Sequence, residues 1–388
     1  MPNTSSSHNR SKHNTKTNPF LPWVVFFSLL LIIASGVLIY LVQFNAKATT
    51  GVDYSIGLNA QLGFDCDFSE AQRLYPFSDG LMKVTASRVA FLSVTGNEIF
   101  TVDISMEVPM QAQSENYFVV ADQDGFAYAL FNQDGIVYYR HTEGMISFVT
   151  VSDEGVVGLI TDVSDAFGSV CIIDSEGNQA AQWTSFESGY PLSLDYSPDG
   201  RILNVSLVDI NRSQMQPNIK QLYIPVDLRE QKPYEYGHYS PDVSNILSVA
   251  AWIDNQTLLV SGISDVVCSR DGQIIPFEVS YANIINVFET DYGGAIIYSN
   301  GVGQELRIEH IYTSLERTET VVLGNHIKAY ATDRELIIIA IDDRLIYYDI
   351  ENGAIDKTLE IDEEIIRMML RDEKVVLVTT SGVREISI

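Results

Sequence analysis

The pattern that most constrains this chain is a long succession of short β-favouring runs. From Gly57 onward, each run ends at Asp, Gly, Asn or Ser, and another run follows at once. Such punctuated runs are typical of β-strands, and glycine accepts the positive φ that tight hairpins need. The most helix-like stretch, Glu364–Glu373, is also predicted to be a strand, because the next strand follows it directly. The sequence therefore predicts an all-β fold. The acid-Gly pairs at the expected turns are Asp124-Gly125, Asp134-Gly135, Glu154-Gly155, Glu176-Gly177, Asp199-Gly200 and Asp271-Gly272.

These runs group into repeats. Gly155 and Gly200 are 45 residues apart, and 337 residues follow from Val52 to the end. Four-stranded propeller blades repeat at about 40–45 residues, so eight blades fit best and seven are the alternative. We expect a single β-propeller over residues 57–388. By eye, its units begin near Gly80, Asn116, Ile146, Leu192, Ile246, Ile285, Ile327 and Ile365.

The unit from Ile365 has only three predicted strands. A fourth strand from around Tyr54 to Phe64 would pair the two ends of the chain. Such pairing would close the ring and remove an unpaired sheet edge.

The strands inside a unit are apolar on both faces. Glu335–Ile341 and Phe126–Phe131 place apolar side chains at odd and even positions alike. A strand needs this pattern when it packs between two neighbouring sheets. The hairpin Asp124–Thr142 is therefore predicted to be the outer half of a blade.

The N-terminal region predicts a membrane anchor. Leu21–Val42 carries no charge, and its 22 residues would span about 33 Å as a helix. More basic residues precede this segment than follow it, which places the N-terminus in the cytoplasm. We expect a disordered cytoplasmic tail (1–20), a transmembrane helix (21–43), a tether (44–56) and an extracytoplasmic propeller at the plasma membrane. The alternative is a signal peptide cleaved at Ala46-Lys47-Ala48.

Charge limits the partners of the predicted ectodomain. The first 50 residues hold four of the 24 basic side chains and none of the 51 acidic ones, so the remainder has a net charge of −31. Such a field disfavours nucleic acid and anionic lipid headgroups. Solvation outside the cell explains the acids, and an acidic patch for a cationic or calcium-dependent partner is the alternative.

No familiar catalytic or metal motif accompanies this pattern. Cys66, Cys171 and Cys268 are widely spaced, which fits neither a disulfide framework nor a zinc site, and the last two are predicted to be buried thiols. Asp122 and Asp124 fit a hairpin turn better than a calcium loop. No G-x-S-x-G motif marks a serine hydrolase. We therefore predict no cofactor and no metal.

Two motifs resemble those of known propellers. "GFAYALFNQDG" (Gly125–Gly135) resembles the repeat of quinoprotein-type propellers, with Tyr138 or Tyr139 at the usual tryptophan position. "SPDG" (Ser197–Gly200) resembles the turn of WD-repeat-like propellers. The chain as a whole is similar to an uncharacterised family of single-pass membrane-anchored propellers of Gram-positive bacteria. This resemblance implies the fold and the location and no activity. The few tryptophans argue against a quinone cofactor.

A functional surface is predicted where the strand pattern breaks. Val208–Tyr223 lengthens one hairpin, and Arg229–Asn245 is the longest segment without a strand pattern. Loops on a rigid scaffold often carry recognition, and tyrosines suit interfaces. The alternative is a packed connection between blades. The predicted partner-binding residues are Arg229, Lys232, Tyr234, Tyr236, His238 and Tyr239.

Three functions are compatible with these features. The first is a binding or scaffolding module for an envelope protein or cell-wall polymer, without catalysis. The second is a hydrolase or lyase with its site in the central channel. The third is a sensor that reports through the single helix. Fold does not decide among them.

Overall fold

The computed structural model describes residues 52–54, 62–211, 215–243, 245–277, 279, 281–333, 336–371 and 373–388. The predicted tail, the predicted transmembrane helix and most of the predicted tether lie outside these residues. None of the helices within the described ranges is long and apolar enough to cross a membrane. Residues 53–388 form one compact unit.

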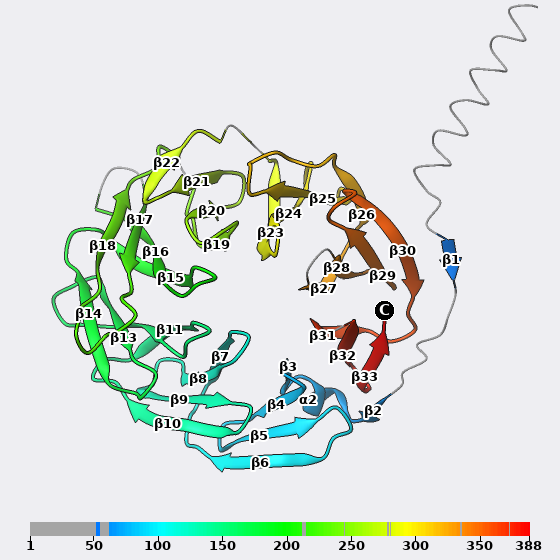
Figure 1. The fold of residues 1–388 in the computed structure, drawn as a ribbon, viewed down its shortest axis with the longest axis horizontal. Coiled ribbons are helices and arrows are strands. Elements are labelled where there is room, and N and C mark those ends of the chain that lie inside the picture. Colours follow the sequence, from blue (N-terminus) through cyan, green and yellow to red (C-terminus); the bar gives the residue numbers. More distant parts are fainter. Residues whose placement is uncertain are drawn as a thin grey trace, which may run out of the picture. The chain divides into compact units, whose positions relative to one another are not determined.

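In the described part of the chain, this unit is a ring of eight antiparallel sheets around a central channel (Figure 1). The prediction of an eight-bladed all-β propeller is confirmed, and seven blades are excluded. Within each blade, the first strand lines the channel and the fourth lies at the rim.

We number the blades along the chain. Blade I contains β3 (Leu74–Phe77), β4 (Gly80–Val84), β5 (Arg88–Ser93) and β6 (Glu98–Asp103); blade II contains β7 (Pro109–Gln113), β8 (Phe118–Asp122), β9 (Ala127–Asn132) and β10 (Gly135–His141). Blade III contains β11 (Ile146–Val151), β12 (Val157–Thr161), β13 (Gly168–Ile173) and β14 (Gln179–Ser185); blade IV contains β15 (Tyr190–Tyr196), β16 (Ile202–Asp209), β17 (Gln216–Tyr223) and β18 (Tyr234–Tyr239).

The second half of the ring follows the same plan. Blade V contains β19 (Val249–Trp252), β20 (Thr257–Ser261), β21 (Val266–Arg270) and β22 (Gln273–Ile275); blade VI contains β23 (Asn283–Thr290), β24 (Gly293–Ser299), β25 (Leu306–Tyr312) and β26 (Val321–Gly324). Blade VII contains β27 (Ile327–Asp333), β28 (Leu336–Ile341), β29 (Arg344–Asp349) and β30 (Ala354–Glu360), beside which β1 (Val52–Tyr54) is a fifth strand. Blade VIII contains β31 (Ile365–Arg371), β32 (Lys374–Thr379), β33 (Gly382–Ser387) and, as its outermost strand, β2 (Leu62–Asp65).

Blade VIII closes the ring with both ends of the folded region. Leu62, Gly63, Phe64 and Asp65 of β2 pair with residues of the C-terminal strand β33. The prediction that a strand near Tyr54–Phe64 completes the last unit is confirmed. A short helix, α2 (Phe68–Ala71), leads from β2 into blade I, and the Asp67 carboxylate caps it by accepting the Glu70 N–H at 2.9 Å.

The second strand of a blade is buried on both faces. Every residue of β8, β12, β16, β20 and β24 is buried, as are all residues of the third strand β13. These strands lie between the sheets of neighbouring blades, so side chains at odd and even positions are both covered. This packing between neighbouring blades explains why Phe126–Phe131 and Glu335–Ile341 have apolar side chains at odd and even positions alike.

The described residues form eight apolar clusters, one in each gap between neighbouring blades. For example, Phe77 and Met82 of blade I pack with Phe118 and Phe131 of blade II. The first blade meets the last one through Leu74 and Val378, among others. The core is therefore distributed around the ring, and each blade is stabilised by both of its neighbours. The other clusters follow the same arrangement.

The acid-Gly pairs lie in hairpin turns, as predicted. Gly135, Gly155, Gly177, Gly200 and Gly272 have positive φ, which explains glycine at these five positions. The remaining pair, Asp124-Gly125, differs from these five. There the aspartate has the positive φ (57°), and the glycine does not.

The units that we began at Gly80 and Asn116 start one strand earlier, at Leu74 and Pro109. Glu364–Glu373 does contain a strand, β31, as expected. The prediction that Arg229–Asn245 lacks a strand is wrong, because Tyr234–Tyr239 forms β18, the rim strand of blade IV.

Candidate functional site

The six predicted partner-binding residues lie along and just before the rim strand β18, but they do not form one surface. Arg229 forms an ion pair with Glu176, and the Lys232 ammonium donates to the Ala180 carbonyl at 2.6 Å. Both contacts cross to blade III. These two cations therefore help to join neighbouring blades.

The tyrosines of the segment divide between solvent and core. Tyr234 is 55% exposed and stacks on Tyr223 at a ring-centroid distance of 5.0 Å. The Tyr236 ring lies 6.5 Å from the same Tyr223 ring, and its hydroxyl donates to Asp271 at 3.4 Å. Tyr236 and Tyr239 both pack against the apolar cluster between blades IV and V.

A buried cation lies beneath this strand. The Lys220 side chain is 6% exposed, forms an ion pair with Glu235, and lies 5.1 Å from the centre of the Trp183 ring. The hydrogen bond from Lys220 lowers the pKa of Glu235. Partial burial of its ring, and secondarily the charge of Lys220, lower the pKa of His238. The rim thus combines a tyrosine strip, in which Tyr234 is exposed and the other two rings are half-buried, with charges used within the fold. We call Tyr223, Tyr234 and Tyr236 the rim strip.

A second candidate site is a cavity in the central channel. Its volume is about 500 Å³, and the first strands of blades I, II, VI, VII and VIII line it. Pockets that bury small ligands have about 300–1,000 Å³. Its walls combine aliphatic side chains with amides, tyrosines and two cations. Its polar and aromatic lining residues are Tyr75, Gln111, Gln113, Asn286, Lys328, Tyr330 and Arg367.

Arg367 on β31 is held in place at one side of this cavity. Its guanidinium carbon lies 4.2 Å from the centre of the Tyr75 ring, and its Nη1 donates to the Leu74 carbonyl at 3.4 Å. Both partners belong to β3 of the neighbouring blade I. The guanidinium is part-buried, and it has no carboxylate partner among the residues that the structure describes. An arginine fixed by stacking is pre-organised to bind an oxyanion.

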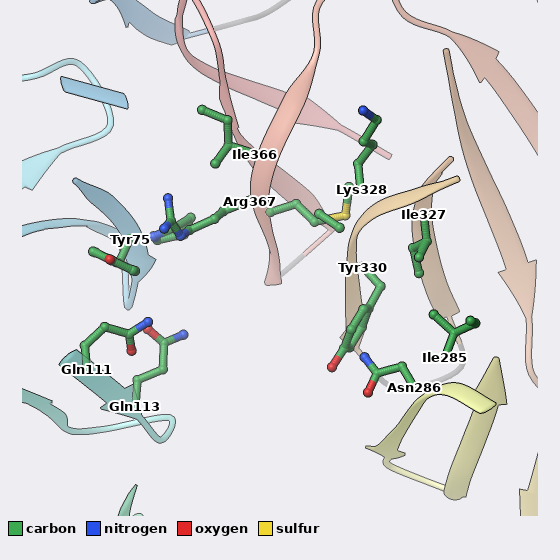
Figure 2. Close-up of a pocket in the computed structure, with 13 residues that line it drawn as sticks. Tyr75, Gln111, Gln113, Ile285, Asn286, Ile327, Lys328, Tyr330, Ile366 and Arg367 are labelled. Carbon is green, nitrogen blue, oxygen red and sulfur yellow. The ribbon is translucent and has the colours of Figure 1, made fainter. Parts of the chain in front are cut away.

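The remaining polar groups of the cavity are neutral or already paired. Figure 2 shows Tyr75, Gln111 and Gln113 on one side and Tyr330 with Asn286 on the facing side. The Tyr330 ring stacks on Phe288 at 4.1 Å, and burial raises the pKa of its phenol, which therefore carries its proton. Lys328 forms an ion pair with Glu364 at 2.8 Å. The cavity thus offers neutral hydrogen-bonding groups and one unpaired positive charge.

Carboxyl groups interact near the opposite ends of the first strands. Burial raises the pKa of Glu289 on β23 to about 7, and the charges of Asp153 and Asp291 add to this shift. Burial, followed by Glu289, also raises the pKa of Asp195 on β15. Glu289 lies on the channel-lining strand β23 and is accessible to water. Asp195 belongs to blade IV and Glu289 to blade VI, so this coupling acts between two blades that are not adjacent.

These carboxyl groups do not form a metal site. No group of three His, Cys, Asp or Glu side chains within the described ranges is placed to hold a metal ion. The channel thus has two regions of opposite charge: a cationic side at Arg367 and an acidic end at Glu289.

Sequence analysis considered a site in the central channel but named none of the residues that line this cavity. Its residues come from five strands distributed over the whole chain, and each contributes two to four side chains. The available signal is weak: Gln111, Gln113 and Arg367 are polar residues within otherwise β-favouring runs. Nothing local in the sequence places them together.

Comparison with solved structures shows the fold. BamB from Moraxella catarrhalis matches with a TM-score of 0.52 at 11% identity, covering 85% of this chain and 100% of that one. Chaetomium thermophilum Sqt1, bound to the N-terminus of the ribosomal protein L10, matches with a TM-score of 0.54, 11% identity and the same coverages. The dihydro-heme d1 dehydrogenase NirN matches with a TM-score of 0.52 and 13% identity, covering 74% of this chain and 66% of that one.

Sequence comparison gives a single family. A search of the curated proteins finds no match. The profile described as "Family of unknown function (DUF5711)" matches residues 60–388, which include all eight blades.

Proposed function

This chain belongs to DUF5711, a family of unknown function, and we propose that it is a membrane-anchored extracytoplasmic binding module. In this proposal, the propeller engages an envelope protein or a cell-wall polymer, and the segment Leu21–Val42 supplies the location. The protein performs no catalysis in this role.

The observation that carries the proposal is the pre-built recognition cavity in the channel. Five blades contribute to it, and its single unpaired charge is oriented by Tyr75 and Leu74 before any ligand arrives. Pre-organised groups on a rigid scaffold favour binding, because little conformational entropy is lost when the ligand binds. The rim strip, through its exposed Tyr234, offers a second contact surface of the kind that interfaces favour.

The charge distribution supports the location. Arg10, Lys12 and Lys16 precede the apolar segment, and only Lys47 follows it closely. An excess of basic residues before an apolar segment favours a cytoplasmic N-terminus. Protease treatment of intact cells tests it, because an epitope tag at the C-terminus should be removed while one at the N-terminus is retained.

Crosslinking in intact cells, followed by purification of the full-length protein, tests the binding function. We expect one specific envelope component to copurify. Replacing Tyr223, Tyr234 and Tyr236 together by alanine tests the rim strip, and Arg367→Gln tests the channel. The matched surface variant Arg344→Gln should change nothing, because Arg344 is 40% exposed and lies on β29. A protein that is recovered alone under all conditions would contradict the proposal.

One observation favours a second candidate, a hydrolase or lyase in the channel. A carboxyl group with a pKa of about 7, such as that of Glu289, is suited to general acid-base catalysis near neutral pH. A panel of chromogenic glycosides and esters tests this candidate. Turnover that is lost in Glu289→Gln and kept in Glu305→Gln, which changes an exposed carboxylate, would favour it over pure binding.

A further inference from the structure

The channel cavity shows what kind of ligand the proposed binding function serves, so this inference rests on that function. The environment of the Arg367 guanidinium is the feature that indicates the ligand. The protein has 51 acidic side chains, and yet this part-buried guanidinium contacts none of them in the described part of the chain. Removing a cation from bulk water without a partner is unfavourable. A ligand that supplies an oxyanion would complete the site.

The contacts of Arg367 leave room for such a ligand. Its ring contact with Tyr75 covers one face of the guanidinium, and its Nη1 bond to Leu74 uses one of five N–H donors. The other donors have no partner among the described residues. Arginine binds carboxylate with two parallel hydrogen bonds, and this needs two free neighbouring donors.

The rest of the cavity indicates what surrounds the oxyanion. Apolar side chains form much of the wall, and the primary amides of Gln111 and Gln113 can each both donate and accept. The Asn286 amide oxygen already accepts the Val287 N–H at 2.9 Å. Amide pairs of this kind match the N–H and C=O groups of a peptide backbone. The aliphatic part of the wall comprises Pro76, Ile285, Ile327, Ala329, Ile366 and Met368.

Electrostatics on a larger scale argues against a polyanion. The propeller side of the chain has a net charge of −31, and Glu289, Asp153, Asp195 and Asp291 lie at the other end of the first strands. A ligand with many negative charges would be repelled by this field, whereas a single carboxylate can bind locally at Arg367. Peptide is therefore favoured over an anionic polymer.

We infer that the channel cavity binds a peptide segment of a partner protein, with one carboxylate of that segment on Arg367 and apolar residues beside it. The carboxylate comes from an Asp or Glu side chain or from a free C-terminus. The rim strip is not required for this contact.

Selection from a display library of random peptides tests the inference on the full-length protein in mild detergent. We expect the selected peptides to share a single acidic residue, or a free C-terminus, next to apolar residues. Amidation of the C-terminus and exchange of Glu for Gln in a selected peptide separate the two sources of carboxylate. Sodium polyphosphate should compete poorly.

Variants connect the selected peptides to the site. Loss of a charge-assisted hydrogen bond should weaken binding of a selected peptide by about tenfold or more in Arg367→Gln, measured by fluorescence anisotropy. Arg367→Lys should recover part of the affinity, and Arg344→Gln should leave it unchanged. Thermal unfolding of each variant verifies its folding, since Arg367 also contacts blade I.

Several results would overturn the inference. These are a selection that yields no peptides, selected peptides without a carboxylate, strong competition by polyphosphate, and equal affinity in Arg367→Gln. None of these results would by itself contradict the proposed binding function. A copurifying envelope component that is lost in the rim-strip variant and kept in Arg367→Gln would leave the binding module intact and remove the channel as its site.

Discussion

Phe64 pairs with Val383 across the closing edge of the ring, although 319 positions separate them in the sequence. The strand that holds Phe64 has only four residues, so the closure depends on few backbone contacts. Its neighbour Gly63 lies so close to β33 that an added Cβ would be 2.2 Å from the Val383 carbonyl oxygen. The backbones of β2 and β33 therefore lie too close at Gly63 for any side chain at that position.

Gly63→Ala should therefore weaken the closure. We expect the free energy of unfolding to fall by about 1–3 kcal/mol, since strand β2 must move away from β33. Chemical denaturation followed by circular dichroism measures this change. Gly135→Ala is the matched control, because Gly135 has a similar φ of 145° and nothing within 4 Å of its Cβ position. Equal losses in the two variants would show that backbone conformation, and not the contact, is responsible.

His310 should make the fold sensitive to acid. Burial lowers the pKa of this fully buried imidazole to about 4, while its Nε2 is 2.7 Å from the Thr290 hydroxyl oxygen. The unfolded chain, with a pKa of about 6.5, binds a proton first, so stability is complete above pH 6.5 and is lost as the pH falls toward 4. The contribution is on the order of 2–3 kcal/mol.

Unfolding free energies at pH 7 and pH 4.5 measure this effect. His310→Gln should lose less stability on acidification than the wild type, because it has no imidazole to protonate there. His141→Gln, at an exposed position on β10, should keep the wild-type pH dependence. A wild-type dependence in His310→Gln would contradict the assignment.

Glu289 should give the stability of the fold a pH dependence opposite to that of His310. Its folded pKa of about 7 exceeds the ordinary value of 4.5, so the folded state binds the extra proton between these values. Stability contributed by this group is present below pH 4.5 and is lost as the pH rises through 7. Glu289→Gln should therefore raise the melting temperature at pH 8 and leave it nearly unchanged at pH 4.5. A variant that is destabilised at pH 8 would exclude the proposed repulsion.

Two ion pairs of the rim should differ in strength. Glu235→Gln leaves the buried Lys220 without its carboxylate, and we expect a loss of about 1–3 kcal/mol. Glu176→Gln removes the partner of Arg229, whose side chain is 67% exposed, and such exposed pairs contribute about 0–1 kcal/mol. Urea denaturation of the two variants in parallel measures the difference. Similar losses would mean that water still reaches Lys220.

The rim strand β18 could not be recognised from the sequence pattern of its residues. Strands between two sheets, such as β28, reveal themselves because both faces are apolar. A rim strand has one sheet neighbour and one solvent-facing side, so it needs no continuous apolar pattern. Tyr234–Tyr239 contains glutamate, glycine and histidine and therefore resembles a loop in sequence, although it pairs with β17.

The sequence by itself determined the repeat, the all-β class and the closure of the ring, because these depend on the local alternation of apolar runs and turns. Neighbouring residues of one strand express that alternation directly. Only the tertiary structure decided which side chains meet in the channel. Tyr75 and Arg367 are 292 positions apart and touch because the last blade is the neighbour of the first. Their contact follows from the number of blades and their register in space, and no local pattern encodes it.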